Sequence, residues 1–319
     1  MDQLPFRNLS SPLTDEMLAP LPESCQWVQF SSLPTPGDLD RIAGLLERHP
    51  QAGLRAYGGY DGSIRDLSFL SHFPRPRRFQ IDVYELQNLD GLEHLPDDVD
   101  VLGIGETRRR IGLDQLARFR QLRSLYVAKH ARGLEVVSQL TGLEALTLRS
   151  ITLDGLDILL PLERLTTLDL KLGGTRDLTQ LPKVGRLRYV ELWMIRGLHD
   201  LDAVADLEHL EFLFLQSLPK VDRLPSLRRC INLRRVHLET MKGLTDLRPV
   251  ADAPDLEELL IVDMPHLNPD VLSCFVGHPT LRGASVGLGS LQRNRAAREA
   301  LGLPDPPPRT RPAFGLDVR

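Results

Sequence analysis

The residue pairs that could support catalysis are few and widely separated in this sequence of 319 residues. Cys230 and His237 lie seven positions apart, and a thiol beside a histidine base is a recurring nucleophilic pair. One of them falls on a return segment and the other on a predicted strand, which favours separate structural roles. The nine histidines include no His-Glu-x-x-His motif and no Cys/His cluster with ligand spacing. We therefore expect no metal site and no cofactor.

Acidic residues on predicted strands are a second candidate, because paired carboxylates can act as general acid and base. The residues concerned are Asp82, Asp169, Glu191, Glu239 and Glu258. A flat sheet surface offers no pocket that would exclude water and shift their pKa values. The sequence therefore predicts no catalytic residues and a chain that is not an enzyme.

Short glycine-rich and basic motifs have two interpretations each. Gly287-Leu288-Gly289-Ser290 precedes a predicted helix and could bind an anion, but a helix cap is the stronger interpretation. The basic runs at 75–78 and 108–110 lie among many acidic residues, which favours a solvated surface. With a net charge of −4, the composition predicts neither nucleic acid nor a membrane as partner.

Cysteine use and apolar run lengths bear on the cellular compartment. No apolar run approaches the roughly 18 residues of a membrane span. The start, Met1-Asp2-Gln3-Leu4-Pro5, lacks the basic segment and apolar core of a secretory signal. Cys25, Cys230 and Cys274 are scattered and odd in number, which is typical of a reducing compartment. We expect a cytoplasmic protein.

The elements that position these residues come from one repeated motif, L-x-x-L-x-L. Its middle apolar residue falls at positions 81, 102, 125, 146, 168, 190, 213, 236, 259 and 284. Successive copies are 21 to 25 residues apart, which is the spacing of leucine-rich repeats and shorter than that of helix-pair repeats. Such regularity over ten copies is the strongest signal in the sequence.

Strand alternation explains how this motif folds. In x-L-x-L-x the two leucines point to one face and the variable residues to the other. Stacked copies bury their leucines in a shared core, whereas a single copy cannot. Each unit has room for short helical or 3₁₀ turns on its way back. The sequence therefore predicts an α/β fold: a right-handed leucine-rich-repeat solenoid with a parallel concave sheet, about ten repeats and helical caps.

The return segment Gly243–Leu259, G-L-T-D-L-R-P-V-A-D-A-P-D-L-E-E-L, is similar to that of the short bacterial and SDS22-like leucine-rich-repeat class, which includes the internalins. The resemblance covers roughly residues 78–288. It departs three positions after the second strand leucine, where the class usually has asparagine. Here the residues are Thr107, His130, Ile151, Gly173, Ile195, Leu218, Met241 and Met264. We expect these turns to pack by apolar contact instead.

The flanking segments are predicted to cap the leucine core. We expect an N-terminal region and cap at 1–53, repeats at 54–288, a cap helix at 289–303 and a disordered Pro-rich tail at 304–319. Asp38 is the expected N-cap of a helix at 38–49, between short strands at 27–30 and 54–57. Ser290 is the expected N-cap of a helix that buries Leu291, Ala297 and Leu301.

The variable strand positions of the middle repeats form the candidate binding surface. They are Arg149, Asp169, Lys171, Tyr189, Glu191, Trp193, Phe212, Phe214, Gln216, Arg235, His237 and Glu239. Strands about 4.8 Å apart bring the aromatic members into one cluster with a charged rim, the composition of a binding hot spot. Exposed phenylalanine is costly unless something covers it, and a protein partner, a segment of the same chain or a homodimer would each do so.

These observations favour a non-catalytic protein-interaction module that binds a protein partner on the concave face. The alternative is a substrate-recognition or regulatory subunit of a separate enzyme. The resemblance implies roles such as toxin immunity or phosphatase regulation without selecting either. The partner's identity does not follow from the sequence.

Overall fold

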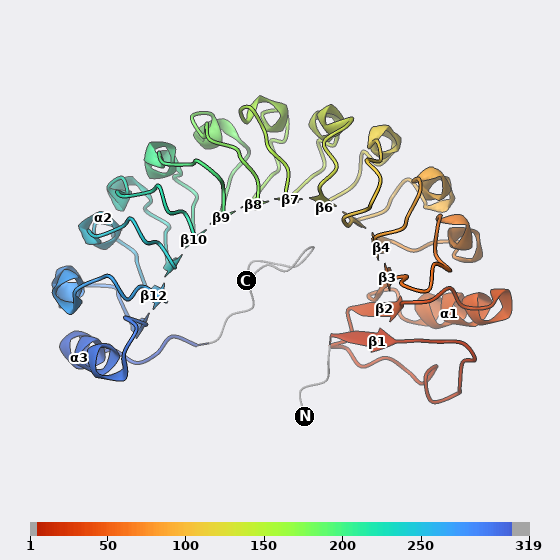
Figure 1. The fold of residues 1–319 in the computed structure, drawn as a ribbon, viewed down its shortest axis with the longest axis horizontal. Helices are drawn as coiled ribbons and strands as arrows, with labels where there is room; N and C mark the ends of the chain where they lie inside the picture. Colours follow the sequence, from red (N-terminus) through yellow and green to blue (C-terminus); the bar gives the residue numbers. More distant parts are fainter. Residues whose placement is uncertain (1–4, 308–319) are drawn as a thin grey trace. The chain divides into compact units, whose positions relative to one another are not determined.

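The computed structural model describes residues 5–307. It contains two compact units, Met1–Leu143 and Glu144–Arg319. Both repeat one element, a short strand followed by a turn, a short helical segment and a return to the next strand (Figure 1). In each unit the strands lie side by side and the helical segments lie on one side of them. This arrangement is a leucine-rich-repeat solenoid, as the sequence predicts.

The first unit holds six strands, and each pairs in parallel with the next. The strands are β1 (Phe6–Asn8), β2 (Trp27–Phe30), β3 (Gly53–Gly58), β4 (Arg78–Val83), β5 (Val101–Ile104) and β6 (Ser124–Ala128). The helical segments are α1 (Pro36–Arg48), η1 (Ser68–His72), η2 (Asp90–His94), η3 (Asp114–Arg118) and η4 (Leu134–Gln139). The strands predicted at 27–30 and 54–57 are confirmed, and β1 was not foreseen.

The second unit holds seven parallel strands, again paired in chain order. They are β7 (Ala145–Arg149), β8 (Thr167–Lys171), β9 (Tyr189–Trp193), β10 (Phe212–Gln216), β11 (Arg235–Glu239), β12 (Glu258–Val262) and β13 (Gly283–Val286). The helical segments are η5 (Asp157–Leu159), η6 (Leu181–Lys183), η7 (Asp202–Asp206), η8 (Leu227–Arg229), α2 (Arg248–Ala251), η9 (Pro269–Phe275) and α3 (Leu291–Leu301). All ten predicted repeat positions fall within β4 to β13.

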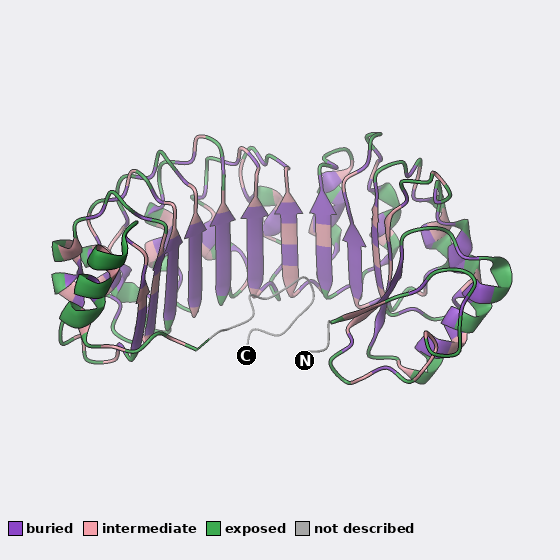
Figure 2. Ribbon diagram, turned by 60° about the horizontal axis from the view of Figure 1, so that its bottom comes forward, coloured by how far each residue is buried: buried purple, intermediate pink, exposed green. Residues whose placement is uncertain are grey.

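Leucine alternation sets the core of each unit. The inward residues of β9 and β10, Val190, Leu192, Leu213 and Leu215, are fully buried. Strands are largely buried along their length, while the turns at their ends are exposed (Figure 2). The helical segments are short, mostly 3₁₀, because a repeat of about 22 residues leaves room for little more. These features confirm the predicted assignment of inward and outward strand positions, and they confirm the predicted short return segments.

Apolar packing replaces an asparagine ladder at the turns. Ile151, Ile195, Leu218, Met241 and Met264 stand at the usual asparagine position, and each is at most 4% exposed. The expectation of apolar turn contacts is confirmed at these five positions, whereas the buried side chains of Thr107 and His130 contact the backbone carbonyls of Arg109 and Gly105. The strand ladder also continues one residue into each turn, for example from the Ser150 N–H to the Lys171 carbonyl.

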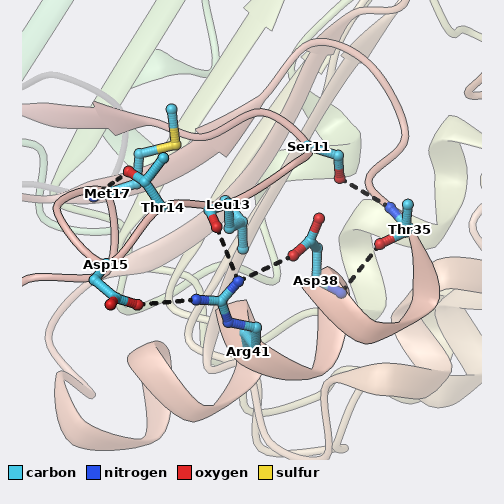
Figure 3. A network of polar contacts seen from close by, with 8 residues as sticks. All are labelled: Ser11, Leu13, Thr14, Asp15, Met17, Thr35, Asp38 and Arg41. Carbon is cyan, nitrogen blue, oxygen red and sulfur yellow. Dashed lines mark hydrogen bonds and ion pairs between the residues drawn. The ribbon is translucent and has the colours of Figure 1, made fainter.

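The N-terminal cap helix begins earlier than predicted. Its N-cap is Thr35, whose Oγ1 accepts a hydrogen bond from the Asp38 backbone, and Pro36 occupies the first helical position (Figure 3). Asp38 instead lies within the first turn and accepts a hydrogen bond from Arg41 at 3.3 Å. Arg41 also contacts Asp15, so the helix is tied to the preceding loop. The expectation that Asp38 is the N-cap is therefore wrong.

The C-terminal cap helix α3 follows Ser290, as predicted. The Ser290 side chain accepts a hydrogen bond from the Arg293 backbone, and Gly302 ends the helix in the left-handed region. Ala297 is fully buried, but Leu291 is 90% exposed and Leu301 only half-buried, so the predicted buried face is wrong at those two leucines. Of the predicted disordered tail, residues 304–307 lie beside β13, and residues 308–319 lie outside the described part.

Candidate functional site

The outward side chains of β7 to β12 form three rows, which the strand register defines. The first row runs through Ala145, Thr167, Tyr189, Phe212, Arg235 and Glu258. The middle row runs through Thr147, Asp169, Glu191, Phe214, His237 and Leu260. The last row runs through Arg149, Lys171, Trp193, Gln216, Glu239 and Val262. Together they are the outward face, and all twelve predicted site residues lie on it.

Three aromatic residues of the outward face form a compact cluster. The rings of Tyr189 and Phe212 meet edge to face, with centroids 4.9 Å apart. Phe214 meets the His237 ring in the same geometry at 4.5 Å. Tyr189 and Phe214 are fully buried, and Phe212 is 8% exposed. We call Tyr189, Phe212 and Phe214 the outer cluster. The sequence predicted one cluster of four aromatic residues, Tyr189, Trp193, Phe212 and Phe214; the buried cluster contains all of these except Trp193.

The expectation that the outer cluster is exposed is wrong. Long side chains on neighbouring strands shield one another, and the Arg235 guanidinium lies 5.3 Å from the centre of the Phe212 ring. The sheet thus has apolar packing on both faces at β9 and β10. A partner cannot touch the rings of Tyr189 and Phe214 in this arrangement.

Beside the outer cluster, two carboxylates share one lysine. Asp169 and Glu191 are direct neighbours on β8 and β9, and both are buried. Lys171 Nζ lies 2.6 Å from Asp169 Oδ2 and 3.2 Å from Glu191 Oε1. The Tyr189 hydroxyl donates to Glu191 Oε2 at 2.6 Å. Burial, and then the negative charge of Glu191, raise the pKa of Asp169 to about 7.

A second charged group lies on the other side of the outer cluster. Arg235 Nη1 donates to Glu258 Oε2 at 2.5 Å, and both side chains are less than a tenth exposed. Glu239 accepts a hydrogen bond from Gln216 Nε2 at 2.7 Å and lies 3.3 Å from His237 Nε2. The aromatic rings are therefore flanked on both sides by ionic groups, as the predicted charged rim requires.

The last row is the accessible part of the outward face. Arg149, Lys171, Trp193, Gln216 and Glu239 are all half-buried. The Lys171 ammonium lies 5.7 Å from the centre of a Trp193 ring, within the range of a cation–π contact. The last row therefore combines a large aromatic ring with a cation, an amide and a carboxylate. Such a surface can make apolar and polar contacts with the same partner.

The turn after each strand extends this accessible edge. Leu172, Met194 and Ser217 follow β8, β9 and β10 with φ of 57°, 50° and 53°, in the left-handed region. Their backbone N–H groups still donate to the last residue of the next strand, for example from Met194 to Gln216. Met194 is 46% exposed beside Trp193. Met194 is not among the predicted site residues, because that prediction included strand positions only.

The structure keeps the candidate nucleophile and base apart. Cys230 is buried below the sheet, where its thiol lies 3.4 Å from the Val204 carbonyl, and burial raises its pKa to about 11. His237 stands on the outward face between Phe214 and Glu239. Within residues 5–307, no group of three His, Cys, Asp or Glu side chains is arranged to hold a metal ion.

The basic runs at 75–78 and 108–110 are only partly solvated surface, because two arginines of the first run make specific contacts. Arg77 makes two hydrogen bonds to the carboxylate of Asp100 in the next repeat, at 2.8 and 3.0 Å. Arg78 is half-buried, and its guanidinium lies 5.0 Å from the centre of a Trp27 ring.

Among the described helices, none has the length and apolar character that crossing a membrane requires.

The repeat and the fold define this chain as a leucine-rich-repeat protein. Among solved structures it is similar to an internalin (inlF) of Listeria monocytogenes, with a TM-score of 0.56 and 15% identity over 82% of this chain and 78% of that one. Others are an internalin C2 of the same species (TM-score 0.43, 16% identity, 69% and 84% covered) and a leucine-rich-repeat protein of Leptospira interrogans (TM-score 0.43, 12% identity, 89% and 92% covered). At these identities the likeness concerns the fold alone. No model of a known protein family matches the sequence, and no curated protein matches it either.

Proposed function

We propose that this chain is a non-catalytic protein-interaction module and that its partner binds the outward face of β7 to β11. The accessible centre of the proposed surface is Trp193 with Met194, and Lys171, Gln216 and Glu239 surround it. Solenoid repeats commonly bind partners through such extended sheet surfaces. The observation that carries the proposal is the half-buried indole of Trp193, the largest side chain of the accessible row.

The chemistry of this surface favours a protein over a small molecule. Trp and Arg side chains at the centre of an interface contribute more binding energy than other residues, and charged neighbours fix orientation. The parallel ladder holds the last row in place, so little conformational entropy is lost when a partner binds. The buried groups behind that row keep its side chains oriented, since Lys171 is anchored by both Asp169 and Glu191.

Replacing Trp193 with alanine is expected to weaken partner binding at least tenfold, because a central tryptophan is a typical hot spot. The partner would be captured from the source organism with the wild-type chain, identified by mass spectrometry and titrated by calorimetry. The matched control is Trp27→Ala, which removes the sequence's other tryptophan, also half-buried beside a cation but in the first unit.

Equal binding by wild type and Trp193→Ala would show that the proposed surface is not the binding site. Loss of binding in both tryptophan variants would indicate a general structural effect, and unfolding curves would confirm it. Loss in Trp193→Ala alone, with an unchanged unfolding midpoint, supports the proposal.

A further inference from the structure

Basic side chains gather along one edge of the sheet in the second unit, where its strands end. Strands β7 to β11 run parallel, so the turns that follow their carboxyl ends lie along that same edge. The last residue of each of these strands and the four residues after it include five basic side chains and a single acidic one, Glu239. The basic residues are Arg149, Lys171, Arg196, Lys220 and Lys242, and we call them the basic edge. The whole chain has a net charge of −4, so this edge is opposite to it in sign.

All members of the basic edge except Lys171 have no partner in the described part of the chain. Within residues 5–307, the side chains of Arg149, Arg196, Lys220 and Lys242 form no ion pair or hydrogen bond. Arg149 is half-buried, and the other three are exposed (Figure 2 shows the exposed turns). Their charges are therefore available to a partner.

Basic residues before the same strands are paired differently. Arg188, directly before β9, makes two hydrogen bonds to the carboxylate of Glu211 in the next repeat, both at 2.8 Å. Arg164, shortly before β8, pairs with Glu144 at 3.0 Å. The amino ends of the strands thus carry charge pairs between repeats, whereas the carboxyl ends carry unpaired cations.

The carboxylates closest to the basic edge are already engaged. Glu239 accepts a hydrogen bond from Gln216 at 2.7 Å and lies 3.3 Å from His237. Asp177, Asp200 and Asp246 begin the return segments, and each accepts a hydrogen bond from the backbone N–H two residues further on, at 2.7 to 3.0 Å. These contacts hold the carboxylates away from the arginines and lysines of the edge.

The basic edge surrounds an accessible apolar centre. Trp193 is half-buried, and Met194 is 46% exposed beside it. Lys171 lies 5.7 Å from the centre of a Trp193 ring on one side. On the other side, the turn after β10 carries Lys220. The complement of such a surface is an apolar side chain flanked by carboxylates.

We propose that the partner binds this edge with an acidic protein segment that carries a large apolar side chain. The inference rests on the proposed function and defines the chemistry of the partner. Carboxylates of the segment pair with the unpaired cations, and its apolar side chain packs on Trp193 and Met194. Four strand spacings, about 19 Å, separate β7 from β11, and about six extended residues span that distance. A nucleic acid fits less well, because Glu239 lies in the same row and the thioether chain of Met194 gives a base no flat surface to stack on.

The test measures the binding of a fluorescein-labelled, glutamate-rich copolymer that contains tyrosine, by fluorescence anisotropy. Wild type is expected to bind it, with an affinity that falls as salt is added. Lys220→Glu and Lys242→Glu are each expected to weaken binding several-fold, and together about tenfold, because reversed charges repel the copolymer. The matched control is Lys183→Glu, the same charge change at an exposed lysine of η6 in the same unit, which is expected to match wild type.

Two further probes give the alternatives a measurable outcome. A copolymer with lysine in place of glutamate, and an oligothymidylate, are both expected to bind more weakly than the glutamate copolymer. Tighter binding of the oligothymidylate would overturn the proposal in favour of a nucleic acid. Equal affinity of wild type, Lys220→Glu and Lys242→Glu for the glutamate copolymer would overturn it as well.

The captured partner separates this inference from the proposed function. A partner whose binding is weakened by Trp193→Ala and by Lys220→Glu supports both. A partner that is weakened by Trp193→Ala but not by Lys220→Glu contradicts the acidic segment and leaves the binding surface in place. A partner that Trp193→Ala does not affect contradicts the proposed function itself.

Discussion

Replacing Phe214 with alanine is expected to lower the free energy of unfolding by about 3–5 kcal/mol, the range for a fully buried phenylalanine. The residue has no exposed surface and meets the His237 ring edge to face. The loss would be large although Phe214 lies on the face opposite the leucine core. The midpoint of urea unfolding, followed by circular dichroism, measures it.

Leu260→Ala is the matched control for this variant. Leu260 occupies the same row two strands away, and it is half-buried. Removal of a half-buried leucine side chain is expected to cost about 1 kcal/mol, because only part of its surface leaves water on folding. If Phe214→Ala destabilises the chain no more than Leu260→Ala does, β10 has one buried face instead of two.

The leucine alternation made most of the fold predictable. Leu213 and Leu215 point into the core because a strand has a period of two, and the 21-to-25-residue spacing left no other stacking. The same alternation placed Phe212, Phe214 and Gln216 together on the outward face, where the structure has them. It specifies the face on which a side chain lies, but not how deeply the side chains of neighbouring strands bury it there. The burial of Phe214 was for that reason unforeseen.

The sequence was a weaker guide to where the two cap helices begin and which of their residues are buried. The pair Thr35-Pro36 is a strong helix start, since Thr accepts the capping hydrogen bond and Pro fits the first helical position. Asp38, the predicted N-cap, also has a capping side chain and directly precedes the apolar Leu39. In α3, few apolar residues are available to set the buried face. Ala297 was assigned correctly, whereas Leu291 faces solvent.

Individual contacts on the outward face depend on register between strands, which the period alone does not specify in detail. The sequence placed Asp169, Lys171 and Glu191 near one another, and their strand positions are confirmed. Side-chain conformations on this crowded face determine the individual contacts. The Lys171 ammonium contacts both carboxylates, and the Tyr189 hydroxyl donates a hydrogen bond to Glu191. The partner-binding role of these residues stays a prediction.

The pair Asp169 and Glu191 leads to a strong pH dependence of stability. The pKa of Asp169 is about 7 in the folded chain, against an ordinary value of 3.8. Between these pH values the folded chain keeps a proton that the unfolded chain has lost, so the free energy of unfolding falls as the pH rises. The contribution of Asp169 is fully present below pH 4 and is lost as the pH passes 7.

Asp169→Asn is therefore expected to stabilise the chain above pH 7 by up to about 4 kcal/mol relative to wild type, the equivalent of a shift of about three pKa units. The difference should shrink steadily towards pH 4, because the buried wild-type carboxyl is then protonated in the folded chain and carries no charge to destabilise it. Urea unfolding midpoints between pH 4 and pH 8 measure this, with Glu163→Gln, an exposed carboxylate in the same unit, as the control. Parallel pH profiles for wild type and Asp169→Asn would show that Asp169 is ionised at neutral pH. In that case Lys171 compensates both buried carboxylates.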